Sequence, residues 1–162
     1  MISDVIMLKG VIFEDFVNYK KPSMTLMFPT CKGFKCGENL CQNSDLANAK
    51  NEVVFINNLL YRYASNPITE AIVLQGLEPF DSLGNLYTLA INLKELEIKD
   101  DIVIYTGYNK DEISTDVINY LIHLIPGRLI IKWGRYIPNQ TPHLDPVLGV
   151  NLASDNQYAE VY

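Results

Sequence analysis

The three cysteines of this 162-residue chain lie within eleven residues of one another, at Cys31, Cys36 and Cys41. Thiolates are the ligands that soft metals prefer, and three on one short segment with Gly33 and Gly37 can wrap a single centre. An odd count in one cluster does not fit a disulfide framework. Because an iron–sulfur cube usually takes four cysteines, a three-cysteine site leaves one iron open for another molecule. The spacing therefore predicts a reactive cluster, which we favour over three unrelated free thiols.

Zinc is the sharpest alternative, because three cysteines and one histidine form a common structural zinc site. The only histidines are His123, on a predicted apolar helix, and His143, in a distant proline-rich segment. His123 is expected to be a packed or half-exposed helix residue, and His143 reaches the cysteines only if its segment folds back. We therefore favour a cluster and keep a zinc-stabilised, non-enzymatic interaction domain as an alternative.

The composition bounds the class of protein. A chain of this length with 48% hydrophobic residues fits one domain, residues 1–162, with a single core. The net charge of −6 and pI near 4.8 argue against a nucleic-acid surface. No apolar run is long enough for a membrane helix, and the first ten residues lack the features of a secretory signal. We expect a cytoplasmic protein.

Strand-like and helix-like segments alternate along the chain. The predicted strands are 7–13, 22–28, 71–74, 101–105 and 128–133, with a short one near 159–162. The predicted helices run from Ser44 to Tyr63, from Leu83 to Leu93, and from an Asn109 N-cap with Glu112 as its capping-box partner to Leu124. The cysteine loop, 29–43, and the C-terminal segment, 134–162, carry no regular period.

This order predicts an α/β fold of mostly parallel strands with right-handed crossovers. The near-continuous apolar strands fit a sheet that is covered on both faces. Four or five strand–helix units are too few to close an eight-stranded barrel, so we expect an open, partial (β/α) barrel.

Three segments follow predicted parallel strands directly: the cysteine loop, Gly76–Pro79 and Thr106–Gly107. Ligands of α/β sheets bind beyond the carboxyl ends of the strands, so we expect these segments to meet at one edge of the sheet.

The order of these motifs resembles the activating enzymes of anaerobic ribonucleoside-triphosphate reductase, within the radical S-adenosylmethionine (SAM) superfamily. Five segments over nearly the whole length carry the resemblance: Cys41-Gln42-Asn43, Gly76-Leu77-Glu78-Pro79, Tyr105-Thr106-Gly107-Tyr108, Gly134-Arg135-Tyr136-Ile137 and Ala153-Ser154-Asp155-Asn156-Gln157. The cysteine gaps are longer than the superfamily's Cys-x3-Cys-x2-Cys. Leu77 stands where the family has a second glycine, which removes the freedom to take a positive φ there.

The resemblance implies a radical SAM-like partial barrel and a set of site residues. Cys31, Cys36 and Cys41 would hold a [4Fe-4S] cluster whose open iron chelates SAM. Glu78 would lie beside the SAM ammonium group; its alternative is a solvated turn residue. Asn43 would hydrogen-bond SAM or cap the following helix, and Thr106 with Gly107 would line the site or form only a tight turn. Other implied SAM contacts are Leu40, in place of an aromatic residue, with Gly76, Leu77 and Pro79.

The implied activity is one-electron cleavage of SAM to a 5′-deoxyadenosyl radical, which takes a hydrogen atom from a glycine of a partner. The partner would be a glycyl-radical enzyme, with anaerobic ribonucleotide reductase as the first candidate, and flavodoxin or ferredoxin would supply the electron. The alternative within the superfamily is a radical SAM enzyme that acts on another peptide or a small molecule.

Overall fold

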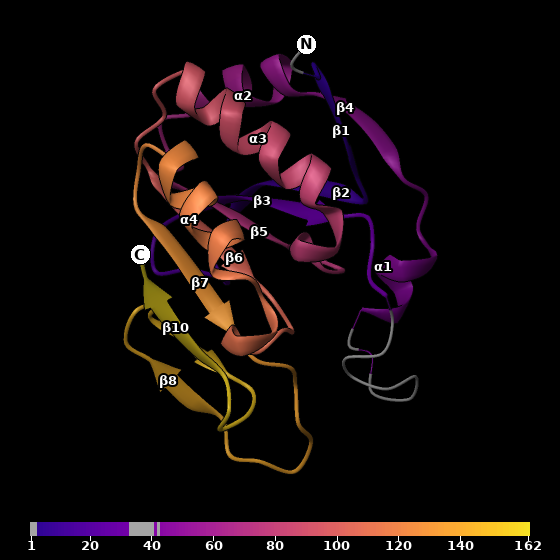
Figure 1. The fold of residues 1–162 in the computed structure, drawn as a ribbon, viewed down its shortest axis with the longest axis vertical. Coiled ribbons are helices and arrows are strands. Elements are labelled where there is room, and N and C mark those ends of the chain that lie inside the picture. Colours follow the sequence, from indigo (N-terminus) through magenta and orange to yellow (C-terminus); the bar gives the residue numbers. More distant parts are fainter. Residues whose placement is uncertain (1–2, 33–40, 42) are drawn as a thin grey trace.

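A six-stranded mixed sheet forms the centre of the molecule in a computed structural model that describes residues 3–32, 41 and 43–162 (Figure 1). Its strand order is β10-β7-β6-β5-β3-β2. The four inner strands, β3 (Ser23–Phe28), β5 (Ala71–Gly76), β6 (Asp101–Tyr105) and β7 (Leu129–Trp133), are parallel. The edge strands β2 (Gly10–Asp15) and β10 (Tyr158–Val161) are antiparallel to their neighbours. The predicted α/β class with a mostly parallel, open sheet is confirmed.

One face of the sheet is covered by helices α2 (Ile56–Ala64), α3 (Leu83–Glu95) and α4 (Thr115–Leu124) (Figure 1). Because the parallel strands are adjacent in sequence order, each right-handed crossover returns on this same face. Alternate strand residues point into the resulting core, among them Leu26, Leu74, Ile104 and the fully buried Trp133.

The opposite face is covered by irregular chain. A second core cluster joins the other strand residues, such as Val73 and Val103, to Tyr19, Leu148 and Leu152. Tyr19 comes from the β2–β3 connection, and the two leucines come from the C-terminal segment with its hairpin of β8 (His143–Asp145) and β9 (Val150–Leu152). This face therefore carries no helix of the crossovers.

Two predicted elements in the first half of the chain are wrong in their bounds. The expected strand 7–13 is divided at Lys9 into β1 (Val5–Leu8) and β2, and β1 leaves the main sheet. The expected helix from Ser44 to Tyr63 is a short helix α1 (Ser44–Asn48), the strand β4 (Glu52–Phe55) and then α2. The β-branched Val53 and Val54 lie in β4, which pairs antiparallel with β1, so a partner from the start of the chain outweighs the helical period.

The helix predicted from Asn109 also begins later. The Asn109–Glu112 capping box is present, but it closes a 3-10 turn, η3 (Lys110–Glu112). The helix α4 starts after a second cap, in which the Ser114 hydroxyl accepts a hydrogen bond from the Asp116 backbone amide. Among the described residues no helix is long and apolar enough to cross a membrane.

Candidate functional site

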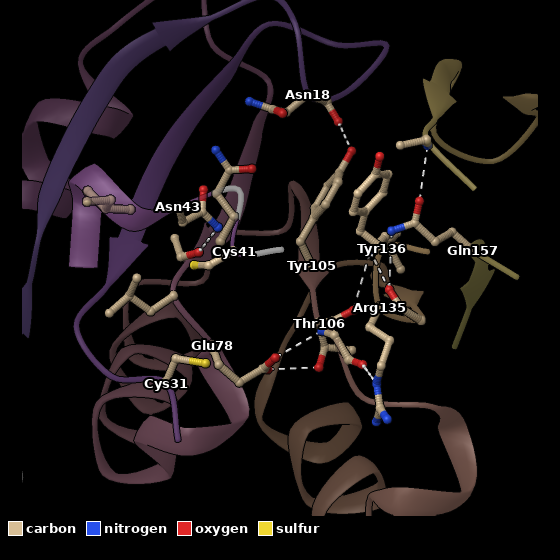
Figure 2. A pocket seen from close by; sticks show the side chains of 18 of the residues that line it. Asn18, Cys31, Cys41, Asn43, Glu78, Tyr105, Thr106, Arg135, Tyr136 and Gln157 are labelled. Atoms are coloured by element: carbon tan, nitrogen blue, oxygen red, sulfur yellow. Dashed lines mark hydrogen bonds between the residues drawn. The ribbon is translucent and has the colours of Figure 1, made fainter. Parts of the chain in front are cut away.

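A cavity of about 540 Å³ lies at the carboxyl edge of the four parallel strands (Figure 2). Every segment that follows one of these strands contributes to its wall, as expected for a parallel sheet. Its lining includes the predicted site residues Cys31, Cys41, Asn43, Gly76, Leu77, Glu78, Thr106 and Gly107. Pro79 is buried at the start of the 3-10 turn η2 (Pro79–Ser82) and does not line the cavity.

Cys31 follows β3, and Cys41 precedes α1, so the two thiols reach the cavity from the two ends of the cysteine loop (Figure 2). Both cysteines are exposed and neither is in a disulfide. Cys36 and Leu40 lie outside the described residues. Two exposed thiols on one cavity wall are accessible to a metal centre.

Gly76 makes the sharp turn at the end of β5 with a φ of +100°. A β-carbon on Gly76 would lie 2.6 Å from the Phe28 backbone nitrogen and 2.8 Å from the Met27 α-carbon, so only glycine fits this close approach. The positive φ falls at Gly76 and not at Leu77, whose amide bonds the Phe28 carbonyl at 3.2 Å. Leucine at position 77, in place of a second glycine, therefore introduces no backbone strain from a positive φ into this turn.

Glu78 is only 2% exposed, and its carboxylate joins the ends of β5 and β6. Its Oε1 accepts hydrogen bonds from the Thr106 hydroxyl at 2.8 Å and the Phe80 amide at 3.2 Å. Its Oε2 accepts one from the Gly107 amide at 2.9 Å (Figure 2). The alternative of a solvated turn residue is wrong. Thr106 and Gly107 both form a turn and line the cavity.

Asn43 occupies the N-cap position of α1, one residue before the predicted Ser44 cap. Its side chain makes no capping bond; its Nδ2 donates to the Gly76 carbonyl at 2.8 Å instead (Figure 2). Asn43 therefore ties the end of the cysteine loop to the turn after β5.

Several cavity residues were not predicted from the sequence. Lys132 is buried on the face opposite the helices, and its ammonium group donates to the Gly134 carbonyl at 2.8 Å and to the Thr106 carbonyl at 3.4 Å. The sequence did carry a signal for Lys132, because it is the single charged residue in the apolar strand 129–133. The neighbouring Tyr105 hydroxyl donates to the Asn18 carbonyl at 2.5 Å. Burial and the charges of Asp145 and Asp15 raise the pKa of Tyr105, so this hydroxyl stays protonated at neutral pH.

Asp81 in η2 is a second residue that sequence reasoning missed. Its Oδ2 accepts a hydrogen bond from the Lys32 amide at 2.9 Å, and its Oδ1 accepts one from the Tyr108 hydroxyl at 2.5 Å. Nothing in the local sequence distinguishes Asp81 from an ordinary acidic residue in the first turn of a helix.

The two C-terminal motifs pack against each other at the end of β7. Gln157 accepts hydrogen bonds from the Ala153 and Ser154 amides and donates to the Gly134 carbonyl. Asn156 donates to the Arg135 carbonyl at 2.8 Å. Gln157 lines the cavity opposite the cysteines (Figure 2), whereas Asn156 does not line it.

Neither histidine lines the cavity. His123 is an exposed residue of α4 with its Nε2 3.2 Å from the Lys94 ammonium nitrogen, and His143 begins β8. Within the described ranges, no group of three or more His, Cys, Asp or Glu side chains is placed to hold a metal ion. A site of three cysteines and one histidine thus gains no support from the described part of the chain.

Comparison with known families identifies a match. The family model described as a 4Fe-4S single cluster domain matches residues 23–140, which is most of the chain and includes β3 through β7. No curated protein and no solved structure matches the chain.

Proposed function

The chain belongs to the family of 4Fe-4S single cluster domains, and from this premise we propose that it is a radical SAM activase for a glycyl-radical enzyme. The family makes it an iron–sulfur protein. SAM, the glycine target and the partner are our proposal.

The cluster ligands would be Cys31, Cys36 and Cys41. Two observations support this assignment: the matched region contains every cysteine of the chain, and the two described cysteines are exposed on one cavity wall. A metal centre there needs thiolates, and both cysteines are exposed residues.

SAM would occupy the rest of the cavity, whose volume of about 540 Å³ is within the range of about 300–1,000 Å³ typical of small-molecule sites. Glu78 would bind its ammonium group. Glu78 lines the cavity, and its carboxylate is held in place by hydrogen bonds from Thr106, Phe80 and Gly107. The buried setting would strengthen the interaction with the ammonium group.

The cluster, when bound, would supply the electron for reductive cleavage of the SAM carbon–sulfur bond. The overall reaction consumes one electron and one hydrogen atom of a partner glycine, and it yields methionine, 5′-deoxyadenosine and a glycyl radical. Flavodoxin or ferredoxin would donate the electron, and anaerobic ribonucleotide reductase is the first candidate partner. The chain's own residues would orient SAM and exclude water from the reacting atoms.

The observation that carries this proposal is that Cys31 and Cys41 line the same cavity as the Gly76–Glu78 turn, at the carboxyl edge of the sheet. Anaerobic reconstitution with iron and sulfide tests it. We expect brown protein with about four irons per chain, an electron paramagnetic resonance spectrum that changes on addition of SAM, and 5′-deoxyadenosine after reduction. Colourless protein that holds zinc without iron or sulfide would overturn the proposal.

The partner requires a separate test. Reduced protein, SAM and anaerobic ribonucleotide reductase should together produce a glycyl-radical signal on the reductase, and omission of SAM should abolish it. SAM cleavage without any such signal would favour another peptide or a small molecule as the substrate.

A further inference from the structure

The two described ends of the cysteine loop are attached to one short segment of the chain, residues 76–81. At the start of the loop, the Lys32 amide donates to the Asp81 carboxylate at 2.9 Å. At its end, the Asn43 side chain donates to the Gly76 carbonyl at 2.8 Å. The same segment contains Glu78, so the loop that carries the cysteines and the proposed SAM contact share one backbone support.

The Asp81 attachment belongs to a continuous hydrogen-bond network. The second Asp81 oxygen accepts from the Tyr108 hydroxyl at 2.5 Å. The Tyr108 amide donates to the Thr106 hydroxyl oxygen at 3.0 Å, and that hydroxyl donates to Glu78 at 2.8 Å. The path thus runs from the residue after Cys31 to the carboxylate that faces the cavity.

The energy of this attachment is large enough to matter for a loop. Hydrogen bonds to an ionised carboxylate are among the stronger ones in proteins, so loss of this bond is expected to loosen the start of the loop measurably. Lys32 and Cys31 are both exposed, so packing contributes little to holding them. The Asp81 carboxylate therefore gives this end of the loop a polar attachment to the segment 76–81.

We propose that Asp81, together with Tyr108, is a positioning residue that holds Cys31 against the SAM subsite and thereby couples SAM binding to retention of the cluster. This inference rests on the proposed function. Coupling of two ligands through one network is reciprocal in affinity: SAM that orders the segment 76–81 tightens the binding of the cluster, and an intact cluster tightens SAM binding by the same factor. A tighter cluster is expected to be lost more slowly.

The test measures iron loss to a chelator from reconstituted protein, followed by cluster absorbance with and without SAM. We expect SAM to slow iron loss several-fold in the unchanged protein. In Asp81→Asn, iron loss should be roughly tenfold faster, because an interaction of at least 1.4 kcal/mol is removed, and the protection by SAM should largely disappear. Tyr108→Phe should give a smaller change in the same direction. Asp111→Asn and Tyr61→Phe, at exposed positions away from the cavity, are the matched controls.

A second measurement needs no cluster. Amide hydrogen exchange at Lys32 in cluster-free protein should be faster in Asp81→Asn and Tyr108→Phe than in either control. Unchanged exchange, or iron loss and SAM protection within twofold of the unchanged protein, would overturn the positioning role alone. Failure of the unchanged protein to take up iron would overturn the proposed function and this inference together. Circular dichroism of each variant checks that it is folded. If Asp81→Asn does not fold, Tyr108→Phe still tests the positioning role.

Discussion

At the residue scale, the backbone conformation of Gly76 determines how the segments of the site are placed. Its φ of +100° turns the chain at the end of β5, and its carbonyl accepts the Asn43 amide that ends the cysteine loop. The sequence placed Gly76 and Glu78 after a predicted parallel strand, and in the structure both line the cavity at the carboxyl edge of the sheet. Asp81 was not indicated, because its partners Lys32 and Tyr108 are distant in the sequence. Lys132 was marked only as a charge in an apolar strand, because its contact with the Thr106 carbonyl depends on the pairing of β6 with β7.

Alanine at Gly76 should lower the free energy of unfolding by about 3 kcal/mol, from backbone strain and the close approach to Phe28. Chemical denaturation of cluster-free protein measures it. The matched control is Gly84→Ala in α3, where an added β-carbon meets no atom within 4 Å. That change should stabilise the protein by about 0.5–1 kcal/mol. Equal effects of the two substitutions would contradict the close approach.

Glu78→Gln should weaken SAM binding by roughly tenfold or more while the iron content stays at the level of the unchanged protein. It removes the charge that faces the SAM ammonium group but keeps the side-chain shape, and a charged hydrogen bond is worth about 1.5–3 kcal/mol. Equilibrium binding of SAM to reconstituted protein measures the effect, with the exposed Glu52→Gln as control. Loss of iron in place of lost affinity would point to a purely structural role for the turn.

Cys31→Ala and Cys41→Ala should each abolish SAM cleavage and leave the far-ultraviolet circular dichroism unchanged. Both side chains are exposed, so no core packing is lost with either thiol. Iron content and 5′-deoxyadenosine formation are the measurements. Full activity in either variant would remove that cysteine from the ligand set.

At the scale of elements, local patterns identified the parallel strands and α3 nearly to the residue, because buried strands and amphipathic helices carry their signals within themselves. They failed between Ser44 and Tyr63. In that region β4 forms because it pairs with β1, which lies more than forty residues earlier in the chain. The spacing of apolar residues within one segment gives no information about a distant strand partner. The Asn109–Glu112 box was read correctly as a cap, but Ser114 starts the helix.

Asp101, at the start of β6, connects elements at the end of the sheet opposite the cavity. Its carboxylate accepts hydrogen bonds from the Tyr19 hydroxyl at 2.8 Å and from Arg128, and it pairs with Lys21 at 2.8 Å. Burial acts to raise the pKa of Asp101, but the bonds from Arg128, Lys21 and Tyr19 outweigh it and lower the pKa to about 2. Burial and Asp101 raise the pKa of Tyr19 to about 12.

Because the pKa of Asp101 is about 2 in the folded chain and 3.8 ordinarily, its ionisation stabilises the fold above pH 3.8. This contribution, about 2 kcal/mol, is lost as the pH falls from 3.8 through 2. Urea denaturation of cluster-free protein should therefore show Asp101→Asn to be less stable at pH 6, with the difference from the unchanged protein shrinking below pH 3.8. A difference that does not change with pH would contradict the role of the charge.

At the scale of the whole molecule, the two faces of the sheet are covered by different kinds of structure. Three helices protect one face, and the other depends on the β2–β3 connection and the C-terminal segment (Figure 1). The helical covering was predictable from the alternation of elements. The covering by the segment 134–162 was not, because its few apolar residues follow no period, and only the tertiary structure distinguishes Leu148, fully buried, from Leu144, 65% exposed.

Leu148→Ala should lower the free energy of unfolding by about 2–4 kcal/mol, as expected for a leucine removed from a packed core. Leu144→Ala, in the same segment, should change it by less than about 0.5 kcal/mol. Thermal and urea denaturation of both variants measure the contrast. Equal small effects would show that the C-terminal segment is not part of the core.

The order of the strands in the sheet follows the order in which a ribosome makes them. Cys31 and Cys41 leave the exit tunnel before Gly76 and Asp81 leave it, and well before Tyr108 does. A nascent chain therefore presents its thiols before it has the support for either end of their loop. We expect iron and sulfide to be inserted after translation, into a chain that has already folded.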